Sequence, residues 1–253
     1  MSGTLTFVFA QRSLQLERID TGDYTPAEYE RYMREIRFIN RHLGDSRALQ
    51  ITLLREIERL DLREFSVLDV ACGSGELLRQ IAEFARGSNR TAKLLAGIDL
   101  NELSTATTLA ESQGFAEITP VRGDAFRLPF ADGSFDFAIS SLFFHHLTDD
   151  QIPLALAEMA RVARRGVFVI DLHRHPAAYY LFKLFCFAFR ISPLVMQDGS
   201  LSVLRGFRPS ELIKLSASSG VRDLKVERTM PFRVVLEGRA KQAETRAVAS
   251  VPR

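Results

Sequence analysis

The chain has 253 residues, of which 46% are hydrophobic and 25% are charged, and its net charge is +2. This size and composition are typical of a globular protein with one α/β domain and additional elements. So small a net charge gives no support for a nucleic-acid or anionic-membrane partner. Only Cys72 and Cys186 are cysteines, far apart in apolar surroundings, which argues against a disulfide framework and favours a cytoplasmic location.

The N-terminal third is predicted to be helical. From residue 26 to residue 43, apolar side chains recur at helical spacing with charges on the opposite face, which predicts an amphipathic helix. Ser46 precedes a second helical pattern that runs to Leu60. The N-terminus has no basic region of the kind that opens a signal peptide. The most apolar later stretch, 177–189, is shorter than the roughly 20 residues of a membrane span, so no span is expected.

From Phe65 onward, short β-rich runs alternate with amphipathic helices. This alternation predicts right-handed crossovers and a mostly parallel, doubly wound sheet. After Asp171 comes an aromatic-rich insert over about 176–206, then a short helix, then two closely spaced strands that suit an antiparallel hairpin. The expected strands are 65–71, 93–100, 117–122, 135–141, 166–172, 221–228 and 231–238, and the expected helices are 75–86, 102–113, 149–164 and 209–220.

This pattern divides the chain into three parts. Residues 1–62 are expected to form an N-terminal extension and helical cap. Residues 63–238 are expected to form the main domain, with the insert at 176–206 as a cap over the substrate. Residues 239–253 are polar and are expected to be a disordered tail.

The stretch "VLDVACGSGELL", residues 67–78, places a glycine turn after the first strand. A phosphate-cradling loop would need a Gly-Lys pair, which the chain lacks. A dinucleotide fingerprint would need a third glycine where Leu78 stands, and the charge of Asp69 would oppose a pyrophosphate. A cationic or zwitterionic ligand without phosphate, such as S-adenosylmethionine, fits better.

Two further acids end later strands. Asp99, in "GIDL", ends the second strand, where a carboxylate can accept both ribose hydroxyls of a nucleoside. Asp124, in "GDAFRLPF", follows the third strand, where a carboxylate can accept from an exocyclic amine. A fourth motif, "DGSFDFAISSLFFHHL", places an Asp-Gly turn before a buried strand.

These four motifs, in this order, resemble the class I S-adenosylmethionine-dependent methyltransferases, and within them the ubiquinone and menaquinone biosynthesis enzymes. The resemblance covers residues 65–172 and, more loosely, 207–237. It implies a Rossmann-like α/β fold with a seven-stranded sheet and S-adenosylmethionine as the cofactor. The cofactor-binding residues that it implies are Asp69, Ala71, Cys72, Gly73 and Gly75 at the amino-acid end, Asp99 and Leu100 at the ribose, Asp124, Ala125 and Phe126 at the adenine, and Ser140 and Ser141 at the methionine moiety.

Catalysis can rest largely on positioning, because methyl transfer is an in-line displacement on an activated sulfonium. A base is needed only if the acceptor loses a proton. The candidates are His145, His146 and His173, and we favour His145, on the expectation that adjacent residues do not both face the site. No metal is expected, because the histidine spacing suits no zinc site and the strand ends lack a set of hard ligands. We interpret Cys72 as a packed residue rather than a nucleophile.

The acceptor is expected to be a small molecule. The chain lacks the Asn/Asp-Pro-Pro-aromatic and Pro-Cys motifs of nucleobase methyltransferases and any basic stripe, so nucleic acid is disfavoured. The aromatic insert is either an ordinary core helix or an apolar cap over an aromatic, polyketide-like or quinone-like acceptor. We favour O-methylation over C-methylation. The alternatives are a catalytically inactive S-adenosylmethionine-binding regulator and a nicotinamide-dependent oxidoreductase, and no feature indicates an oligomeric state.

Overall fold

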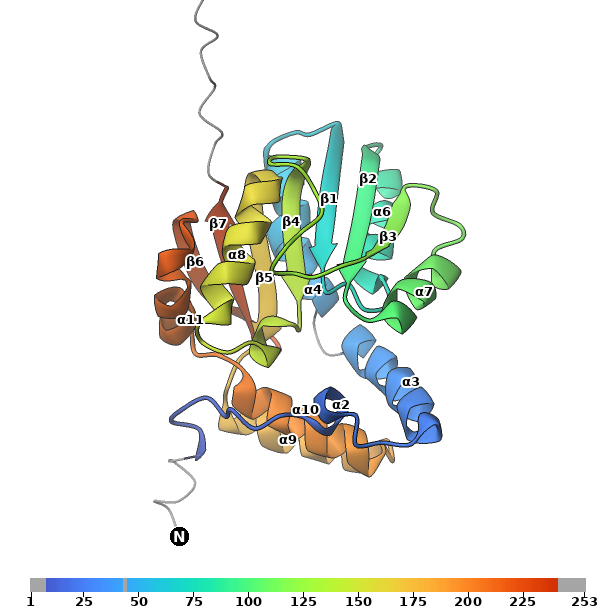
Figure 1. Ribbon diagram of the computed structural model, residues 1–253, viewed down its shortest axis with the longest axis vertical. Helices are drawn as coiled ribbons and strands as arrows, with labels where there is room; N and C mark the ends of the chain where they lie inside the picture. The colour runs from blue at the N-terminus through green and yellow to red at the C-terminus, as the bar shows by residue number, and fades with distance from the viewer. Residues whose placement is uncertain (1–7, 43–44, 241–253) are drawn as a thin grey trace, which may run out of the picture.

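A seven-stranded sheet forms the centre of the computed structural model, which describes residues 8–42 and 45–240 (Figure 1). The strand order is β3-β2-β1-β4-β5-β7-β6. All neighbours pair in parallel except β7, which is antiparallel to both β5 and β6. The order reverses between β1 and β4, the kind of switch point where open α/β sheets bind ligands. The strands are β1 Glu64–Val70, β2 Thr91–Asp99, β3 Ile118–Arg122, β4 Phe135–Ser141, β5 Ala163–Leu172, β6 Arg222–Thr229 and β7 Arg233–Arg239.

Helices α8 (Gln151–Val162) and α11 (Pro209–Ser216) cover one face of the sheet, and α7 (Glu102–Glu111) lies beside β2 and β3. The apolar side of α8, which includes Leu156 and Met159, is completely buried against β-strand residues such as Val169. The 3-10 turns η2 (Phe144–His146) and η3 (Ala217–Ser219) adjoin these helices. The periodic apolar pattern of 149–164 therefore serves the core, as expected.

The other face is covered by α6 (Glu76–Gly87) and by a continuous helical run of α4 (Asp45–Leu49), the π-helix η1 (Gln50–Leu54) and α5 (Arg55–Arg59). Leu53 and Ile57 are buried against Val67 of β1. This run was expected to belong to the N-terminal cap of residues 1–62, and that boundary differs in the structure. The apolar residues of 46–60 pack instead on the part of this sheet face that α6 does not cover.

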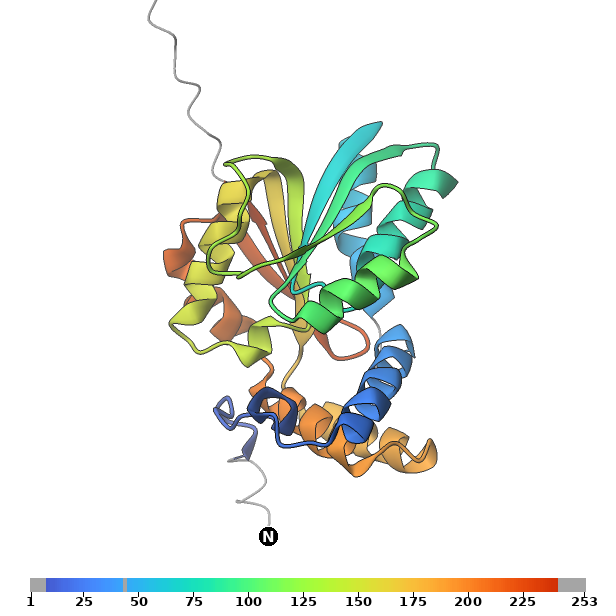
Figure 2. The ribbon, with the colours of Figure 1, turned by 45° about the vertical axis from the view of Figure 1, so that its right-hand side comes forward.

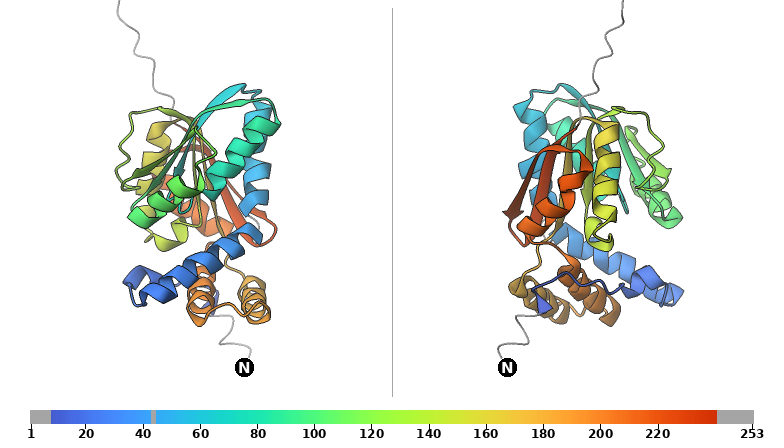
Figure 3. Two further views of the ribbon diagram at one scale, coloured as in Figure 1. Left: turned by 90° about the vertical axis from the view of Figure 1, so that its right-hand side faces the viewer. Right: turned by 60° about the vertical axis from the view of Figure 1, so that its left-hand side comes forward.

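A second layer of helices lies at the carboxyl edge of the sheet, below the two covered faces in these views (Figures 2 and 3). It consists of α2 (Arg18–Thr21), α3 (Pro26–His42), α9 (Pro176–Ala188) and α10 (Pro193–Arg205). We call these four helices the cap. The insert predicted over 176–206 therefore corresponds to α9 and α10, and the helix predicted over 26–43 corresponds to α3.

The segment before α2, residues 8–17, fastens the cap to the sheet. The backbone N–H of Ser13 donates to the carbonyl of Leu204 in α10 at 3.0 Å. The Arg12 guanidinium donates to the carbonyls of Leu147 and Arg205, both at 2.9 Å, and so ties the loop after β4 to the end of α10. This path brings the polar side chain of Glu17 beneath the cap.

The fold class predicted from the sequence is confirmed, including the mostly parallel sheet and the C-terminal hairpin. Strand β7 continues to Arg239, where the tail was expected to begin, and the rest of that predicted tail, 241–253, lies outside the described residues together with Leu43. None of the helices within the described ranges has both the length and the apolarity needed to cross a membrane.

Candidate active site

The glycine turn after β1 has a backbone path that favours small residues. Ala71, Gly73 and Gly75 all have positive φ, at 60°, 55° and 75°. A Cβ on Gly75 would lie only 2.6 Å from Cγ2 of Thr108, whose hydroxyl donates to the carbonyl of Gly73 at 2.9 Å. Both the conformation and the space therefore require glycine at residue 75.

Two carboxylates lie at this turn. Asp99, at the end of β2, accepts from the backbone N–H groups of Gly73 at 3.0 Å and Asn101 at 2.9 Å, so it fixes the turn. Asp69 is buried, and within the described structure its Oδ1 has no hydrogen-bond partner. Burial, together with the nearby charge of Asp99, raises the pKa of Asp69 to about 8. An unpaired buried carboxylate of this kind is suited to a cationic ligand.

The thiol of Cys72 is packed behind the turn. It lies 3.9 Å from the hydroxyl of Thr108, and a Cβ on Gly97 would come within 2.7 Å of it. Burial raises the pKa of this thiol, so it is a poor nucleophile. The geometry agrees with the interpretation of Cys72 as a packed residue.

The remaining predicted cofactor residues follow the ends of β2, β3 and β4. The side chain of Asp124 accepts from the backbone N–H of Phe126 at 2.9 Å, which shapes the loop after β3. Leu100, which follows β2, is exposed. The hydroxyl of Ser140 is buried and donates to the carbonyl of Val70 at 2.8 Å. The hydroxyl of Ser141 is also buried and has no hydrogen-bond partner among the described residues. It can therefore bond to a ligand, whereas the hydroxyl of Ser140 already donates to Val70.

A cavity of about 390 Å³ lies between the cap and the ends of β4, β5 and β7. Most of its wall is apolar, and a small group of polar side chains gathers at one place. We call it the acceptor pocket. Its lining residues are Glu17, Tyr32, Ile36, Ile39, Asn40, Leu142, His145, His146, Leu172, Ala178, Leu181, Phe182, Phe185, Gly199, Ser202, Val203, Pro231, Phe232 and Arg233.

Only part of the aromatic stripe of α9 faces this pocket. Phe182 and Phe185 line it, and Phe182 packs so closely on α10 that a Cβ on Gly199 would lie 2.4 Å from its ring. Tyr180, Phe187 and Phe189 are exposed and do not line the pocket. On α3, Tyr32 lines the pocket, whereas Tyr29 stacks on Tyr24 and accepts a hydrogen bond from Asn101 at 3.3 Å.

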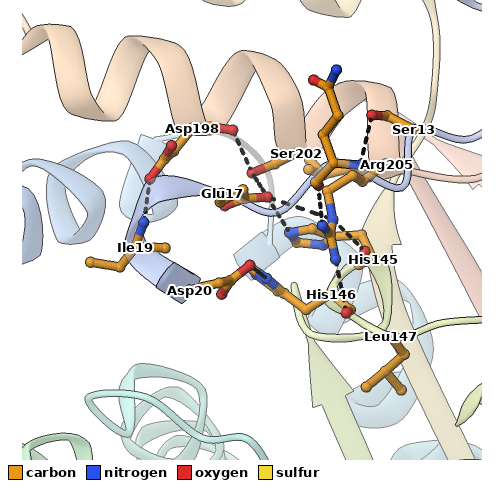
Figure 4. A network of polar contacts seen from close by, with 12 residues as sticks. Ser13, Glu17, Ile19, Asp20, His145, His146, Leu147, Asp198, Ser202 and Arg205 are labelled. Carbon is orange, nitrogen blue, oxygen red and sulfur yellow. Dashed lines mark hydrogen bonds and ion pairs between the residues drawn. The ribbon is translucent and has the colours of Figure 1, made fainter. Parts of the chain in front are cut away.

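The polar end of the pocket is built around His145 (Figure 4). Its Nδ1 lies 2.7 Å from Oδ1 of Asp171, the buried acid near the end of β5, and its Nε2 lies 3.9 Å from Oε1 of Glu17. Glu17 is only 1% exposed and accepts a hydrogen bond from the hydroxyl of Ser202 at 2.8 Å. His145 is therefore held on one side and directed to a buried carboxylate on the other.

His146 lies beside His145, with ring centroids 4.2 Å apart, and both residues line the pocket. The expectation that adjacent residues do not share the site was wrong. Both belong to the 3-10 turn η2, where successive side chains do not point in opposite directions as they do in a strand. Nδ1 of His146 lies 3.2 Å from Oδ2 of Asp20 in α2.

His173 lies outside this group. It is absent from the pocket lining, its ring is 5.5 Å from that of His175, and its backbone N–H donates to the carbonyl of Phe232. Burial, with the nearby charges of His175 and Arg228, lowers the pKa of His173 to about 4. The structure thus brings together two of the three predicted catalytic histidines.

The ionisable groups at the polar end of the pocket shift one another's pKa values. Burial raises the pKa of Glu17 above its ordinary value, although the two histidines oppose this. Burial lowers the pKa of His146, but the hydrogen bond to Asp20 and the charge of Glu17 outweigh it, so the net shift is upward. The Nε of Arg205 lies 4.0 Å from Oε1 of Glu17 and donates to the carbonyl of His145. These groups form one buried network.

Sequence reasoning missed Glu17, Asp20, Ser202 and Arg205. Each is a common polar residue with no motif around it, and each reaches the site only through the path of the cap. The one available signal was Glu17 itself, an acid among alternating apolar residues ahead of the first helix.

Part of this chain is similar to known methyltransferases. Residues 67–166 match a family model described as a methyltransferase domain. The methyltransferase GfsG of Streptomyces halstedii is 40% identical over 114 residues, which are 43% of this chain and 38% of that protein. A demethylmenaquinone methyltransferase of Bacillus licheniformis is 26% identical over 124 residues, which are 49% of this chain and 51% of that protein. The chain thus spans about half, or less, of these relatives.

A solved structure extends the likeness beyond the matched domain. The magnesium protoporphyrin IX methyltransferase of Synechocystis, crystallised with bound S-adenosylhomocysteine, has a TM-score of 0.60 and covers 89% of this chain and 100% of its own, at 16% identity. At that identity the likeness concerns the fold. Together, the matched segment and the strand order resemble a methyltransferase domain of the S-adenosylmethionine-dependent class I type. The predicted resemblance to the menaquinone biosynthesis enzymes is confirmed.

Proposed function

We propose that this chain transfers a methyl group from S-adenosylmethionine to a small, apolar acceptor that is aromatic, quinone-like or polyketide-like, and that the acceptor atom is oxygen rather than carbon. One observation carries the proposal. The apolar acceptor pocket of about 390 Å³ ends at the buried His145–Asp171 pair, directly after the carboxyl end of β4.

The turn after β1 fits the amino-acid end of S-adenosylmethionine. The unpartnered Oδ1 of Asp69 can accept a hydrogen bond from an ammonium group. Because the site is buried, the attraction between the two charges is stronger than it would be in water. Asp99 accepts from the backbone N–H groups of Gly73 and Asn101 and from the side chain of Ser104, and its two oxygens keep further acceptor capacity for a ribose hydroxyl. Bound there, the cofactor would supply a methyl group activated on a sulfonium.

At the acceptor, we assign the proton to His145. Asp171 holds Nδ1, which leaves Nε2 as the nitrogen that faces the pocket and can accept a proton from a hydroxyl. Asp171 acts through His145 and is therefore a positioning residue. His146 also lines the polar end of the pocket, whereas His173 does not line the pocket and is therefore not assigned a role at the acceptor.

Two features support an apolar acceptor with one polar group. The walls formed by α3, α9 and α10 offer aliphatic and aromatic side chains, among them Ile36, Phe182 and Phe185. The polar end can hydrogen-bond a hydroxyl, which favours oxygen as the methylated atom. A relative whose name gives demethylmenaquinone as its substrate is consistent with a quinone-like acceptor.

The test is methyl transfer from methyl-labelled S-adenosylmethionine to a panel of phenols, quinols and hydroxylated polyketide-like compounds, with products identified by mass spectrometry and NMR. We expect O-methylated products from apolar members of the panel. A C-methylated product would overturn the preference for oxygen. Binding of S-adenosylhomocysteine with no transfer to any member would favour a catalytically inactive cofactor-binding regulator.

A further inference from the structure

Three side chains that are able to ligate a metal converge at the polar end of the pocket. Glu17, His145 and His146 each offer one ligand atom, and these atoms all lie within 4.8 Å of one another. Glu17 and His145 are 1% and 3% exposed. Nε2 of His145 lies 3.9 Å from Oε1 of Glu17. That separation is too long for a hydrogen bond, and Oε1, which accepts from Ser202, keeps a second lone pair for a ligand between the two atoms.

The histidines are oriented as metal ligands usually are. A ligating histidine commonly donates its other ring N–H to a carboxylate, which fixes the ring and its tautomer. Here Asp171 holds Nδ1 of His145 at 2.7 Å, and Asp20 holds Nδ1 of His146 at 3.2 Å. Ser202 holds the carboxylate of Glu17 at 2.8 Å. All three candidate ligands therefore have a supporting partner.

The local charge also favours a cation. The carboxylates of Glu17, Asp20 and Asp171 contact the two imidazoles, and Arg205 is the guanidinium that approaches Glu17. Arg205 directs its other donors to backbone carbonyls, including those of His145 and His146. With both histidines in the neutral form that ligates a metal, Glu17, Asp20, Asp171 and Arg205 together carry a net charge of −2, which a divalent ion would neutralise.

We propose that Glu17, His145 and His146 bind a divalent transition metal, with Zn²⁺ or Co²⁺ as the fitting ions. Two imidazoles and one carboxylate suit these ions and not Mg²⁺ or Ca²⁺, which prefer oxygen ligands. Bonds of about 2.0–2.2 Å place neighbouring ligand atoms roughly 3.3 Å apart, so ligand atoms that lie within 4.8 Å of one another must draw together by up to about 1.5 Å. The histidine spacing alone predicted no metal, because the third ligand comes from the distant segment before α2.

Metal binding has a consequence that rests on the proposed function. The ion would take Nε2 of His145, the same atom that we assign to the proton of the acceptor. The two uses exclude each other, so an occupied site blocks methyl transfer and a metal-free site allows it. The group is then a metal-sensitive brake on the active site.

The test begins with EDTA-treated full-length protein and a titration with Co²⁺, followed by visible absorption and calorimetry. We expect one Co²⁺ per chain, displaced by Zn²⁺. Glu17→Gln, which keeps the size and can still accept from Ser202, should weaken binding at least about tenfold, and Asp20→Asn by about 10–100-fold. His175→Gln is the matched control, because His175 is exposed, does not line the pocket and lies beside a second histidine, His173.

Circular dichroism and melting curves establish that each variant is folded. Unchanged Co²⁺ affinity in folded Glu17→Gln, loss of binding in His175→Gln, or no Co²⁺ binding by the folded wild type would overturn the site. A methyl-transfer assay then separates the two proposals. Inhibition by Zn²⁺ that EDTA reverses supports the brake. Binding without inhibition overturns the brake and the role of His145 as base, whereas binding in a protein that transfers no methyl group supports the site and counts against the proposed function.

Discussion

The carboxylate of Asp171 holds His145 at two points. Its Oδ1 lies 2.7 Å from Nδ1 of the imidazole, and its Oδ2 accepts the backbone N–H of the same residue at 3.1 Å. Burial raises the pKa of Asp171, but the charge of His145 and these hydrogen bonds outweigh it and keep that pKa below its usual range. Asp171 therefore remains charged and accepts from Nδ1, so that in the neutral form of the imidazole Nε2 is the proton acceptor.

This arrangement predicts the effect of removing the imidazole. His145→Ala should lower kcat for a hydroxyl acceptor by about 10²–10⁴-fold, because the acceptor proton loses its base. Affinity for S-adenosylhomocysteine should stay within a few-fold, because His145 is remote in sequence from the glycine turn. His173→Gln is the control and should keep near wild-type turnover. Steady-state kinetics and calorimetry measure both quantities, and a fully active His145→Ala variant would rule out the assigned base.

Asp69 predicts a pH dependence of stability. Its pKa is about 8 in the folded protein, against roughly 3.9 in an unfolded chain. Between these values the unfolded chain has released a proton that the folded chain keeps, so stability falls as pH rises and this contribution is lost by about pH 8. In cofactor-free Asp69→Asn, which cannot ionise, the fall in Tm from pH 5 to pH 8.5 should be smaller. Parallel Tm curves for the two proteins would contradict the shift.

The same carboxyl predicts proton release on cofactor binding. An ammonium beside Asp69 favours the ionised carboxylate, so binding of S-adenosylhomocysteine below pH 8 should expel a proton and strengthen from pH 6 to pH 8. Calorimetry in two buffers of different ionisation enthalpy measures the proton count. An equal binding enthalpy in both buffers would show that Asp69 does not meet the ammonium.

Asp99 predicts a loss of cofactor affinity. Asp99→Ala removes a carboxylate that fixes Gly73 and that we assign to the ribose hydroxyls. Hydrogen bonds to a charged group contribute about 1.5–3 kcal/mol, so affinity for S-adenosylhomocysteine should fall at least about tenfold. Glu117→Ala, at the start of the neighbouring strand and paired with Arg86, serves as the control. Equal affinity in wild type and Asp99→Ala, measured by calorimetry, would reassign the ribose ligand.

The cap predicts a change in acceptor kinetics. Phe182 lines the pocket, whereas Leu184 on the same helix is 61% exposed and does not. Phe182→Ser should raise KM for an apolar acceptor about tenfold or more, because an aromatic side chain contributes a large buried apolar area. Leu184→Ser should leave KM unchanged. A loss of Tm in Phe182→Ser with unaltered KM would mean that α9 is only a structural helix.

Most of the fold could be predicted because its signals are local. Each parallel strand and crossover helix shows its own periodicity, and the turn at Gly73 and Gly75 marks the first strand–helix junction. The helical run of 45–59 could not be placed from its pattern, since an apolar stripe shows that a face is buried but not which surface buries it. Its position follows from the face of β1 that α6 leaves open.

The candidate site divides in the same way. Asp69, Asp99 and the glycine turn follow strand ends, so the sheet brings them together and the sequence order predicts it. Glu17 and Asp20 reach His145 and His146 only because residues 8–17 run along α10, a path fixed by long-range bonds such as Arg12 to Leu147. On α3, likewise, Tyr29 lies beside Asn101, and it is Tyr32, one turn later, that lines the pocket.

The central claim is that the Asp69–Asp99 turn binds S-adenosylmethionine for methyl transfer. The most direct measurement is calorimetric titration of the full chain with S-adenosylhomocysteine, and separately with NAD⁺, NADP⁺ and ATP. We predict one S-adenosylhomocysteine per chain, with a matching rise in Tm, and no binding of the three phosphate-containing ligands. Binding of NAD⁺ together with no binding of S-adenosylhomocysteine would contradict the claim and support a nicotinamide-dependent oxidoreductase.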